Sequence, residues 1–107
     1  MLTTTTFDLS GYRVTEQKGM VRGIAVRSPT IKQGILGGLK GVVGGNIKQF
    51  TDMCEQTRGD AYEKMLQHAR SVGANAVVGV RYDASEVVDR ATEVLCYGTA
   101  VIVVEEF

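Results

Sequence analysis

Three side chains in this 107-residue sequence have the chemistry of soft-metal ligands or nucleophiles: Cys54, His68 and Cys96. Thiolate and imidazole groups bind zinc and softer heavy metals, and a closed zinc site needs about four ligands in a tetrahedral array. Nearby oxygen donors are Glu55, Asp60 and Glu63. No C-x-x-C or H-x-x-x-H spacing occurs, so a metal ion is a candidate cofactor that the sequence does not specify.

Each of the three candidates also has a purely structural interpretation. Cys54 lies on the apolar stripe of a predicted helix and Cys96 alternates with Val94 in a predicted strand, so both fit small buried hydrophobes. His68 lies beside that stripe, where a histidine commonly makes a routine polar contact. Cys54 and His68 are about 21 Å apart along a straight helix, so they meet within one subunit only if the helix breaks near Gly59. A site on a symmetry axis, with one ligand from each subunit, stays open.

The motifs that bind phosphate are missing from the sequence. No Gly-Lys pair occurs, which excludes a Walker A loop, and G-x-G-x-x-G is absent. The backbone amides at Asn46 could hold an anion at a helix start, a property of helices in general. No catalytic motif is found, and we expect binding rather than turnover.

A long helix over about residues 47–72 is the clearest predicted element. Asn46 suits the N-cap with Gln49 in the capping-box position, and Gly73 suits the residue after the helix. The apolar stripe follows helical spacing: Ile47, Phe50, Cys54, Ala61, Met65, Ala69 and Val72, widened by Tyr62 and Leu66. Gly59 predicts a weak point or kink in the middle.

Alternating patterns predict strands over residues 19–27, 76–82 and 92–106. In the first, Val21, Gly23, Ala25 and Arg27 share one face. In the second, Ala76, Val78, Val80 and Tyr82 share a face opposite Val77, Gly79 and Arg81. The opening MLTTTTF is an edge strand or an arm, LSGYRV is a turn, and ASEVVDRA is a polar connection.

The second and third strands are largely apolar on both faces. One helix covers only one side of a sheet, so the other side needs a second cover. One candidate is a helix over residues 34–45, where glycines recur at helical spacing; a flexible glycine loop is the alternative. The other candidate is a second copy of the chain.

Composition indicates one soluble domain over residues 1–107, with 44% apolar and 22% charged residues. Twelve basic and twelve acidic residues cancel, so no overall field favours nucleic acid or anionic lipid. The first half is basic and the second acidic; the two meet either inside one fold or between subunits. No leader is visible and the longest apolar stretch, Gly34 to Ile47, is too short to span a membrane. We therefore expect a reduced, cytoplasmic protein.

Several blocks resemble the YbjQ-like family of small bacterial proteins, which carries a heavy-metal-binding label. They are VVGGN, AYEKM followed by AR, GANAVVGV followed by YD, and GTAVIVVE, in this order over about residues 18–104. The resemblance implies an α+β subunit of β-α-β-β order, similar to the dodecin subunit. It further implies an antiparallel sheet on one long helix and a homopentameric ring. Where relatives carry GGRSGAYE this chain has GGNIKQFTDMCEQTRGDAYE, so their helix-start chemistry is not carried over.

Dodecin-like relatives imply aromatic-lined sites between subunits, for which Tyr62, Tyr82 and Tyr97 are the available residues; core or interface packing is their other role. The sequence thus predicts a non-catalytic homo-oligomer that binds a small ligand or ion at subunit interfaces. Two alternatives stay open: a metal-binding protein that uses Cys54, His68 or Cys96, and a structural ring that acts through protein partners.

Overall fold

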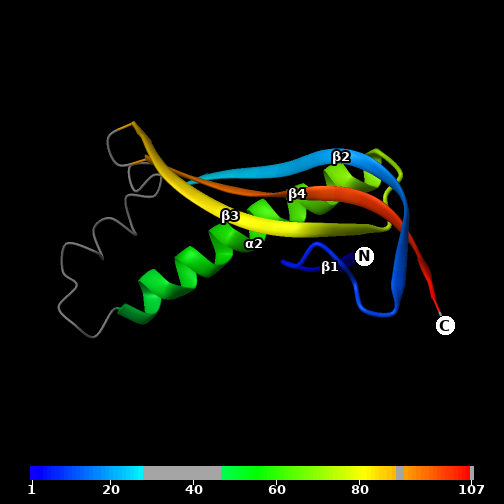
Figure 1. The fold of residues 1–107 in the computed structure, drawn as a ribbon. Coiled ribbons are helices and arrows are strands. Elements are labelled where there is room, and N and C mark those ends of the chain that lie inside the picture. Colours follow the sequence, from blue (N-terminus) through cyan, green and yellow to red (C-terminus); the bar gives the residue numbers. More distant parts are fainter. Residues whose placement is uncertain (28–46, 89–90, 107) are drawn as a thin grey trace.

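A computed structural model describes residues 1–27, 47–88 and 91–106, in which one long helix lies across a twisted sheet (Figure 1). The elements in chain order are β1 (Leu2–Thr3), β2 (Tyr12–Arg27), α2 (Ile47–Ser71), β3 (Ala76–Val88) and β4 (Ala91–Glu105). The strand order in the sheet is β1-β3-β4-β2. The predicted α+β class is confirmed. The three long strands are antiparallel as expected, but β1 pairs parallel with β3, so the sheet is mixed.

Helix α2 matches its predicted bounds to within one residue. It ends in a Schellman motif, in which Gly73 has φ of 83°, the Gly73 amide donates to the Arg70 carbonyl at 3.0 Å and the Ala74 amide donates to the Ala69 carbonyl at 3.1 Å. α2 runs continuously through Gly59, so the break that would let Cys54 and His68 meet within one subunit does not occur. Within the described residues, no helix is both long and apolar enough to cross a membrane.

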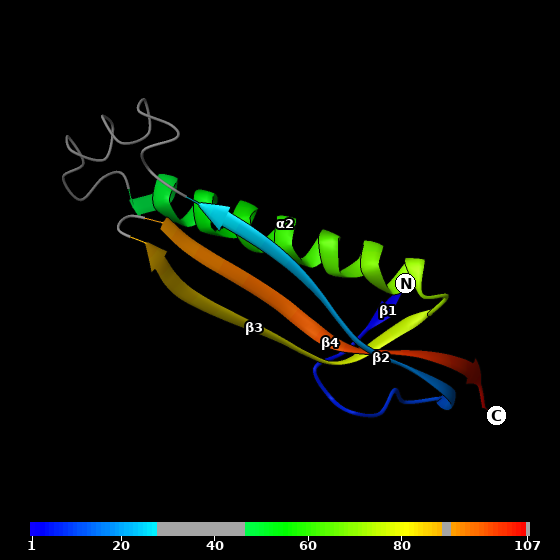
Figure 2. The same ribbon diagram turned by 90° about the horizontal axis from the view of Figure 1, so that it is seen from above.

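The close contact of α2 with β2 depends on Gly23. A Cβ atom at this position would collide with the Ala61 carbonyl and the Met65 amide, and would lie 2.8 Å from the Lys64 Cβ. The helix backbone therefore rests directly on β2, and α2 lies mainly over β2 and β4 and contacts β3 less (Figure 2). The main core fills this layer: Val21, Ala25, Ala61, Met65, Leu66, Ala69, Val77, Val80, Val94, Cys96 and Ala100.

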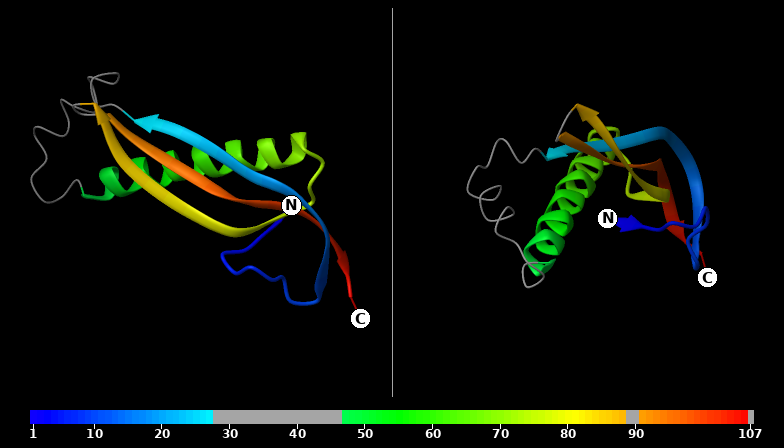
Figure 3. Two further views of the ribbon diagram at one scale, coloured as in Figure 1. Left: turned by 45° about the horizontal axis from the view of Figure 1, so that its top comes forward. Right: turned by 90° about the vertical axis from the view of Figure 1, so that its left-hand side faces the viewer.

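Two strands are longer than predicted. β2 begins at Tyr12, after a turn in which Gly11 has φ of 81°, and not at residue 19. β2 and β4 continue beyond β3 as a curved two-stranded ribbon (Figure 3). β3 runs on to Val88 through the segment predicted as a polar connection. In both places pairing with β4 supplies the backbone hydrogen bonds, so strand formation does not require an apolar sequence.

A β-bulge at Gly79 changes the predicted faces of β3. Val78 pairs with Thr99 and Arg81 pairs with Tyr97, so one extra residue is accommodated between them, where Gly79 has φ of 63°. The prediction that Val78 and Val80 share a face is therefore wrong. Val80 joins Val77 in the core under α2, whereas Ala76 and Val78 face the other side.

The N-terminal segment covers part of the sheet face opposite α2. Leu9 and Tyr12 pack there against a second small core of Ala76, Val78, Val101 and Val103. The predicted edge role of MLTTTTF is confirmed, since Leu2 and Thr3 pair with Ala76 and Val77.

The rest of the outer face of β2 is uncovered by the described residues. Met20, Ile24 and Val26 are 68%, 39% and 55% exposed. Ile24 pairs across the sheet with Leu95, which extends the apolar surface onto β4. The glycine-striped helix predicted over residues 34–45 lies outside the described residues.

Replacing Gly23 by alanine should destabilise the protein, because the added methyl group meets helix backbone that has no flexible end to move. We expect a loss of about 3 kcal/mol in the free energy of unfolding, the upper end for overpacking. Gly59→Ala is the matched control: nothing lies within 4 Å of its Cβ position in α2, so it should gain about 0.5–1 kcal/mol. Urea unfolding at equal protein concentration measures both, and a Gly23→Ala variant as stable as the parent would contradict the close contact.

Candidate functional site

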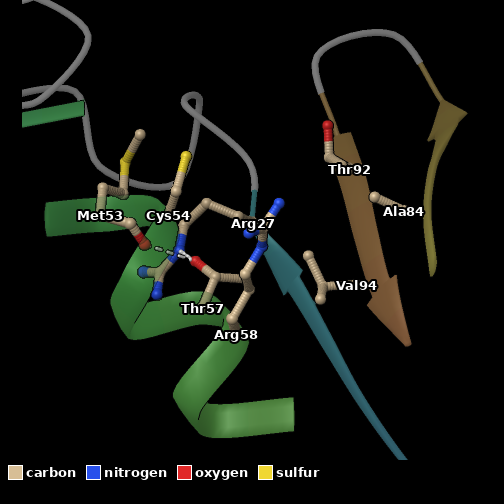
Figure 4. A pocket seen from close by; sticks show the side chains of 8 residues that line it. All are labelled: Arg27, Met53, Cys54, Thr57, Arg58, Ala84, Thr92 and Val94. Atoms are coloured by element: carbon tan, nitrogen blue, oxygen red, sulfur yellow. Dashed lines mark hydrogen bonds between the residues drawn. The ribbon is translucent and has the colours of Figure 1, made fainter. Parts of the chain in front are cut away.

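A groove lies between the first half of α2 and the ends of β2, β3 and β4 (Figure 4). It forms because α2 lies mainly over β2 and β4 and leaves the second half of β3, residues 81–88, exposed. Its volume is about 310 Å³. We call it the arginine groove; its lining residues are Arg27, Met53, Cys54, Thr57, Arg58, Ala84, Thr92 and Val94.

Arg27 is held in place at the end of β2. Its Nε donates a hydrogen bond to Thr57 Oγ1 at 2.8 Å, and one terminal nitrogen lies 3.7 Å from the Asp60 carboxylate. The Thr57 hydroxyl in turn donates to the Met53 carbonyl at 2.8 Å, one turn earlier in α2 (Figure 4). These contacts fix the position of a guanidinium group at the groove.

Arg58 supplies the second positive charge and is exposed. Among the described residues, no carboxylate lies within ion-pairing distance of it. It also lines an adjacent hollow of about 340 Å³, shared with Glu55, Gly59, Tyr62 and Tyr82. We call this second feature the tyrosine hollow.

Cys96, which is fully buried, and Tyr82, which is half-exposed, form a pair beside the tyrosine hollow. Burial raises the pKa of the Cys96 thiol, and the hydrogen bond with Tyr82 opposes that rise only in part. The Cys96 thiol also donates to the Met65 sulfur at 3.6 Å. Burial, together with the charge and hydrogen bond of Cys96, raises the pKa of Tyr82 to about 12. Because thiolates rather than thiols bind metals and attack electrophiles, Cys96 is poorly suited to either role at neutral pH.

The three predicted metal ligands lie apart. Cys54 is exposed at the arginine groove, and Cys96 is fully buried beneath α2. His68 lies near the other end of α2, where its Nδ1 accepts a hydrogen bond from the Arg22 backbone amide at 3.1 Å. Across residues 1–27, 47–88 and 91–106, no three His, Cys, Asp or Glu side chains gather closely enough to hold a metal ion.

Two of the three tyrosines predicted as ligand contacts lie in the same hollow. Tyr62 and Tyr82 line the tyrosine hollow, and the Tyr62 hydroxyl lies 2.9 Å from Thr3 Oγ1. Tyr97 instead pairs with Arg22 and Arg81 on the outer face of the sheet, away from the other two. Asn46, the predicted anion contact, lies outside the described residues.

Sequence reasoning did not single out Arg27, Thr57 or Arg58 as site residues. One signal was present: the alternation of β2 places Arg27 on the same face as Val21 and Ala25, and an arginine on a core-facing stripe needs a polar partner. That partner is Thr57, the one polar residue buried in the described structure. Arg58 gave no comparable signal, because nothing in the sequence shows that α2 leaves the second half of β3 uncovered.

The pKa of Tyr82 predicts how stability changes at alkaline pH. Because its folded-state pKa of about 12 exceeds the ordinary value of 10.0, the folded protein keeps the phenol proton where the unfolded chain loses it. The contribution of Tyr82 to the free energy of unfolding is therefore independent of pH below pH 10. It falls as the pH rises from 10 to 12. Unfolding at a series of pH values should show a steeper fall for the parent than for Tyr82→Phe. If stability falls equally steeply with pH in the parent and in Tyr82→Phe, the pKa of Tyr82 is not raised in the folded protein.

Comparison with known proteins places the chain in a family. The sequence profile of the YbjQ family, described as "Putative heavy-metal-binding", matches residues 1–104. A UPF0145 protein of Solibacter usitatus is 58% identical over 101 residues, covering 94% of this chain and 90% of the relative. A UPF0145 protein of Legionella pneumophila is 48% identical over 103 residues, covering 96% and 98%.

A solved structure supports the fold. A Pediococcus pentosaceus protein of unknown function, assigned to the DUF74 family, superimposes with a TM-score of 0.64 at 20% identity, covering 97% of this chain and 98% of its own. From the profile match and the close relatives, the chain belongs to the YbjQ family of UPF0145 proteins.

Proposed function

We propose that the protein is a homo-oligomer that binds a small ligand or ion close to the contacts between its copies. The observation that carries this proposal is the pair of long strand edges that no other strand of the described residues pairs with. Binding is favoured over catalysis, because the described side chains at the arginine groove lack a general base paired with a nucleophile.

Both open edges are long. β2 has 16 residues and pairs with another strand, β4, along one side only. On its other side α2 occupies two backbone groups, because the Arg22 amide donates to His68 Nδ1 and Lys64 Nζ donates to the Ile24 carbonyl, and the rest of this edge faces no strand. On the other side of the sheet, the N-terminal segment pairs with β3 only as far as Val80, whose amide donates to the Thr4 carbonyl at 3.0 Å. The described part of the chain leaves β3 unpaired along that side from Tyr82 to Val88. Exposed strand edges pair readily with other strands unless they are protected.

The two edges differ in charge. β2 carries Arg13, Lys18, Arg22 and Arg27 against one acid, Glu16, whereas residues 82–88 carry only the acids Asp83 and Glu86. Pairing of β2 from one copy with β3 of the next would join opposite charges. Such a head-to-tail contact forms a ring when its rotation closes and a filament when it does not, and we propose a ring here. We expect five copies, the number that the family resemblance implies.

Association also accounts for the apolar outer face. Met20, Ile24 and Val26 border the open edge of β2, so a neighbouring copy would remove them from water. Burying apolar surface contributes about 25 cal/mol per Å². The edge supplies backbone hydrogen bonds and register, and the outer face supplies hydrophobic free energy.

The proposed ligand site adjoins the proposed contact. Ala84 lies both in the lining of the arginine groove and in the unpaired part of β3. A ligand in the groove would therefore lie close to the neighbouring copy. Both cysteines are free, which suits a reducing compartment, and we propose a cytoplasmic location.

Metal binding, the main alternative, depends on the same association. Cys54 is exposed, so several copies could present this thiol around an axis. Elemental analysis of the assembled protein separates the two functions. We expect no stoichiometric metal; a metal content that is retained on purification and lost in Cys54→Ser would favour the metal-binding alternative.

Charge reversal tests the proposed contact. Asp83→Lys with Glu86→Lys should weaken assembly, because it places like charges on both edges, and Lys18→Glu with Arg22→Glu should do the same. Combining all four changes should restore assembly in part. Native mass spectrometry gives the particle mass as a multiple of 11.6 kDa.

Lys48→Glu with Arg70→Glu on α2 is the matched control and should leave the mass unchanged. A parent protein of 11.6 kDa, or charge variants that assemble like the parent, would overturn the proposed contact.

A further inference from the structure

We propose that the arginine groove binds small carboxylates that carry an apolar body, of the size and character of a medium-chain alkanoate. This inference rests on the proposed binding function and names its ligand class. The lining of the groove comes from a single chain, so ligand binding and assembly can be tested separately.

The walls of the groove suit an apolar body. Met53, Ala84 and Val94 contribute thioether and aliphatic surface, and Met53 adapts its shape readily. A volume of about 310 Å³ lies at the lower end of the range for small-molecule pockets, about 300–1,000 Å³. A polar ion such as free phosphate would leave this apolar surface unused.

The charges at the groove suit a carboxylate. Arg27 and Arg58 both line it, and no acidic residue is among the lining residues. The Asp60 carboxylate approaches Arg27 only to 3.7 Å and is itself half-exposed, so it compensates that guanidinium incompletely. Guanidinium groups bind carboxylates through paired charge-assisted hydrogen bonds. The same two charges would repel a cationic ligand or a metal ion.

The position of Arg27 is set before any ligand arrives. Its bond to Thr57, and the bond from Thr57 to the Met53 carbonyl, anchor the guanidinium to α2. An arginine that is already ordered loses little side-chain entropy on binding. Arg58 is exposed and projects from α2, the same helix to which Arg27 is anchored, and Ala84 and Val94 lie on the strands across from that helix (Figure 4).

Cys54 provides a reporter inside the groove. It is the exposed thiol, whereas Cys96 is buried, so a neutral alkylating reagent modifies Cys54 first. We would measure the rate of Cys54 alkylation by iodoacetamide by intact mass, in the full-length protein with increasing octanoate. Octanoate should slow alkylation in a saturable manner. Acetate, which lacks the tail, and octylammonium, which reverses the charge, should give at most one tenth of the protection at equal concentration.

The variants assign the effect to the groove. Arg58→Met keeps the length of the side chain but removes its charge, and should weaken octanoate protection at least tenfold. Arg58→Lys should weaken it less. Arg70→Met, at the other end of α2, is the matched control and should behave as the parent. Protection is expressed as the ratio of rates with and without octanoate for each variant, which cancels any difference in the reactivity of the thiol itself.

The outcomes separate this inference from the proposed assembly. Three results would each overturn the carboxylate site. They are no protection by octanoate, equal protection by octylammonium, and a ratio of alkylation rates for Arg58→Met that equals the ratio for the parent. Native mass spectrometry of the same samples reports the assembly. An intact ring without protection rejects the ligand class alone, and protection in a monomer rejects the assembly alone.

Discussion

The contact between the α2 backbone and Gly23 fixes how much of the sheet the helix covers. Because no side chain separates them, α2 lies directly on β2, and its buried residues Ala61, Met65 and Ala69 fill the space above β2 and β4. One helix has a limited width, so it buries Val77 and Val80 in the first half of β3 but leaves residues 81–88 exposed. The arginine groove and the tyrosine hollow both follow from this placement.

The sheet face opposite α2 is also only partly covered. The N-terminal segment packs Leu9 and Tyr12 onto it near the start of β3, and Phe7 lies against Gly79 at the bulge. Beyond that point the described residues leave the apolar outer face exposed and two strand edges without a neighbouring strand. In the proposed assembly, a second copy of the chain would supply both a hydrophobic cover and backbone partners, and assembly and ligand binding would then be linked properties.

Much of the fold follows from sequence patterns. Helical spacing predicted α2, and Gly73 marked its end because only a residue that tolerates positive φ suits the Schellman position. Alternation predicted which residues of β2 face α2, but it did not predict the first half of this strand. The residues there are mostly polar, and they form a strand because β4 pairs with them. The faces of β3 were partly wrong because the bulge at Gly79 is a property of pairing, which a single-strand pattern does not contain.

The candidate site was predicted only in fragments. Tyr62 and Tyr82 were named and lie together, because one faces the sheet from α2 and the other faces α2 from β3. Cys54, His68 and Cys96 do not converge, since α2 is continuous and holds the first two at opposite ends. Arg58 became a site residue only through the placement of α2, which depends on three-dimensional packing at Gly23.

Hydrogen exchange along residues 82–88 tests the central claim most directly. In an antiparallel strand, alternate amides point to either side, so pairing with β4 alone protects only about half of them. If a neighbouring copy covers the open edge, nearly all amides in this segment should exchange slowly at working concentration. Half of them should become fast when dilution dissociates the particle. Half-protection that does not change with concentration would contradict the account.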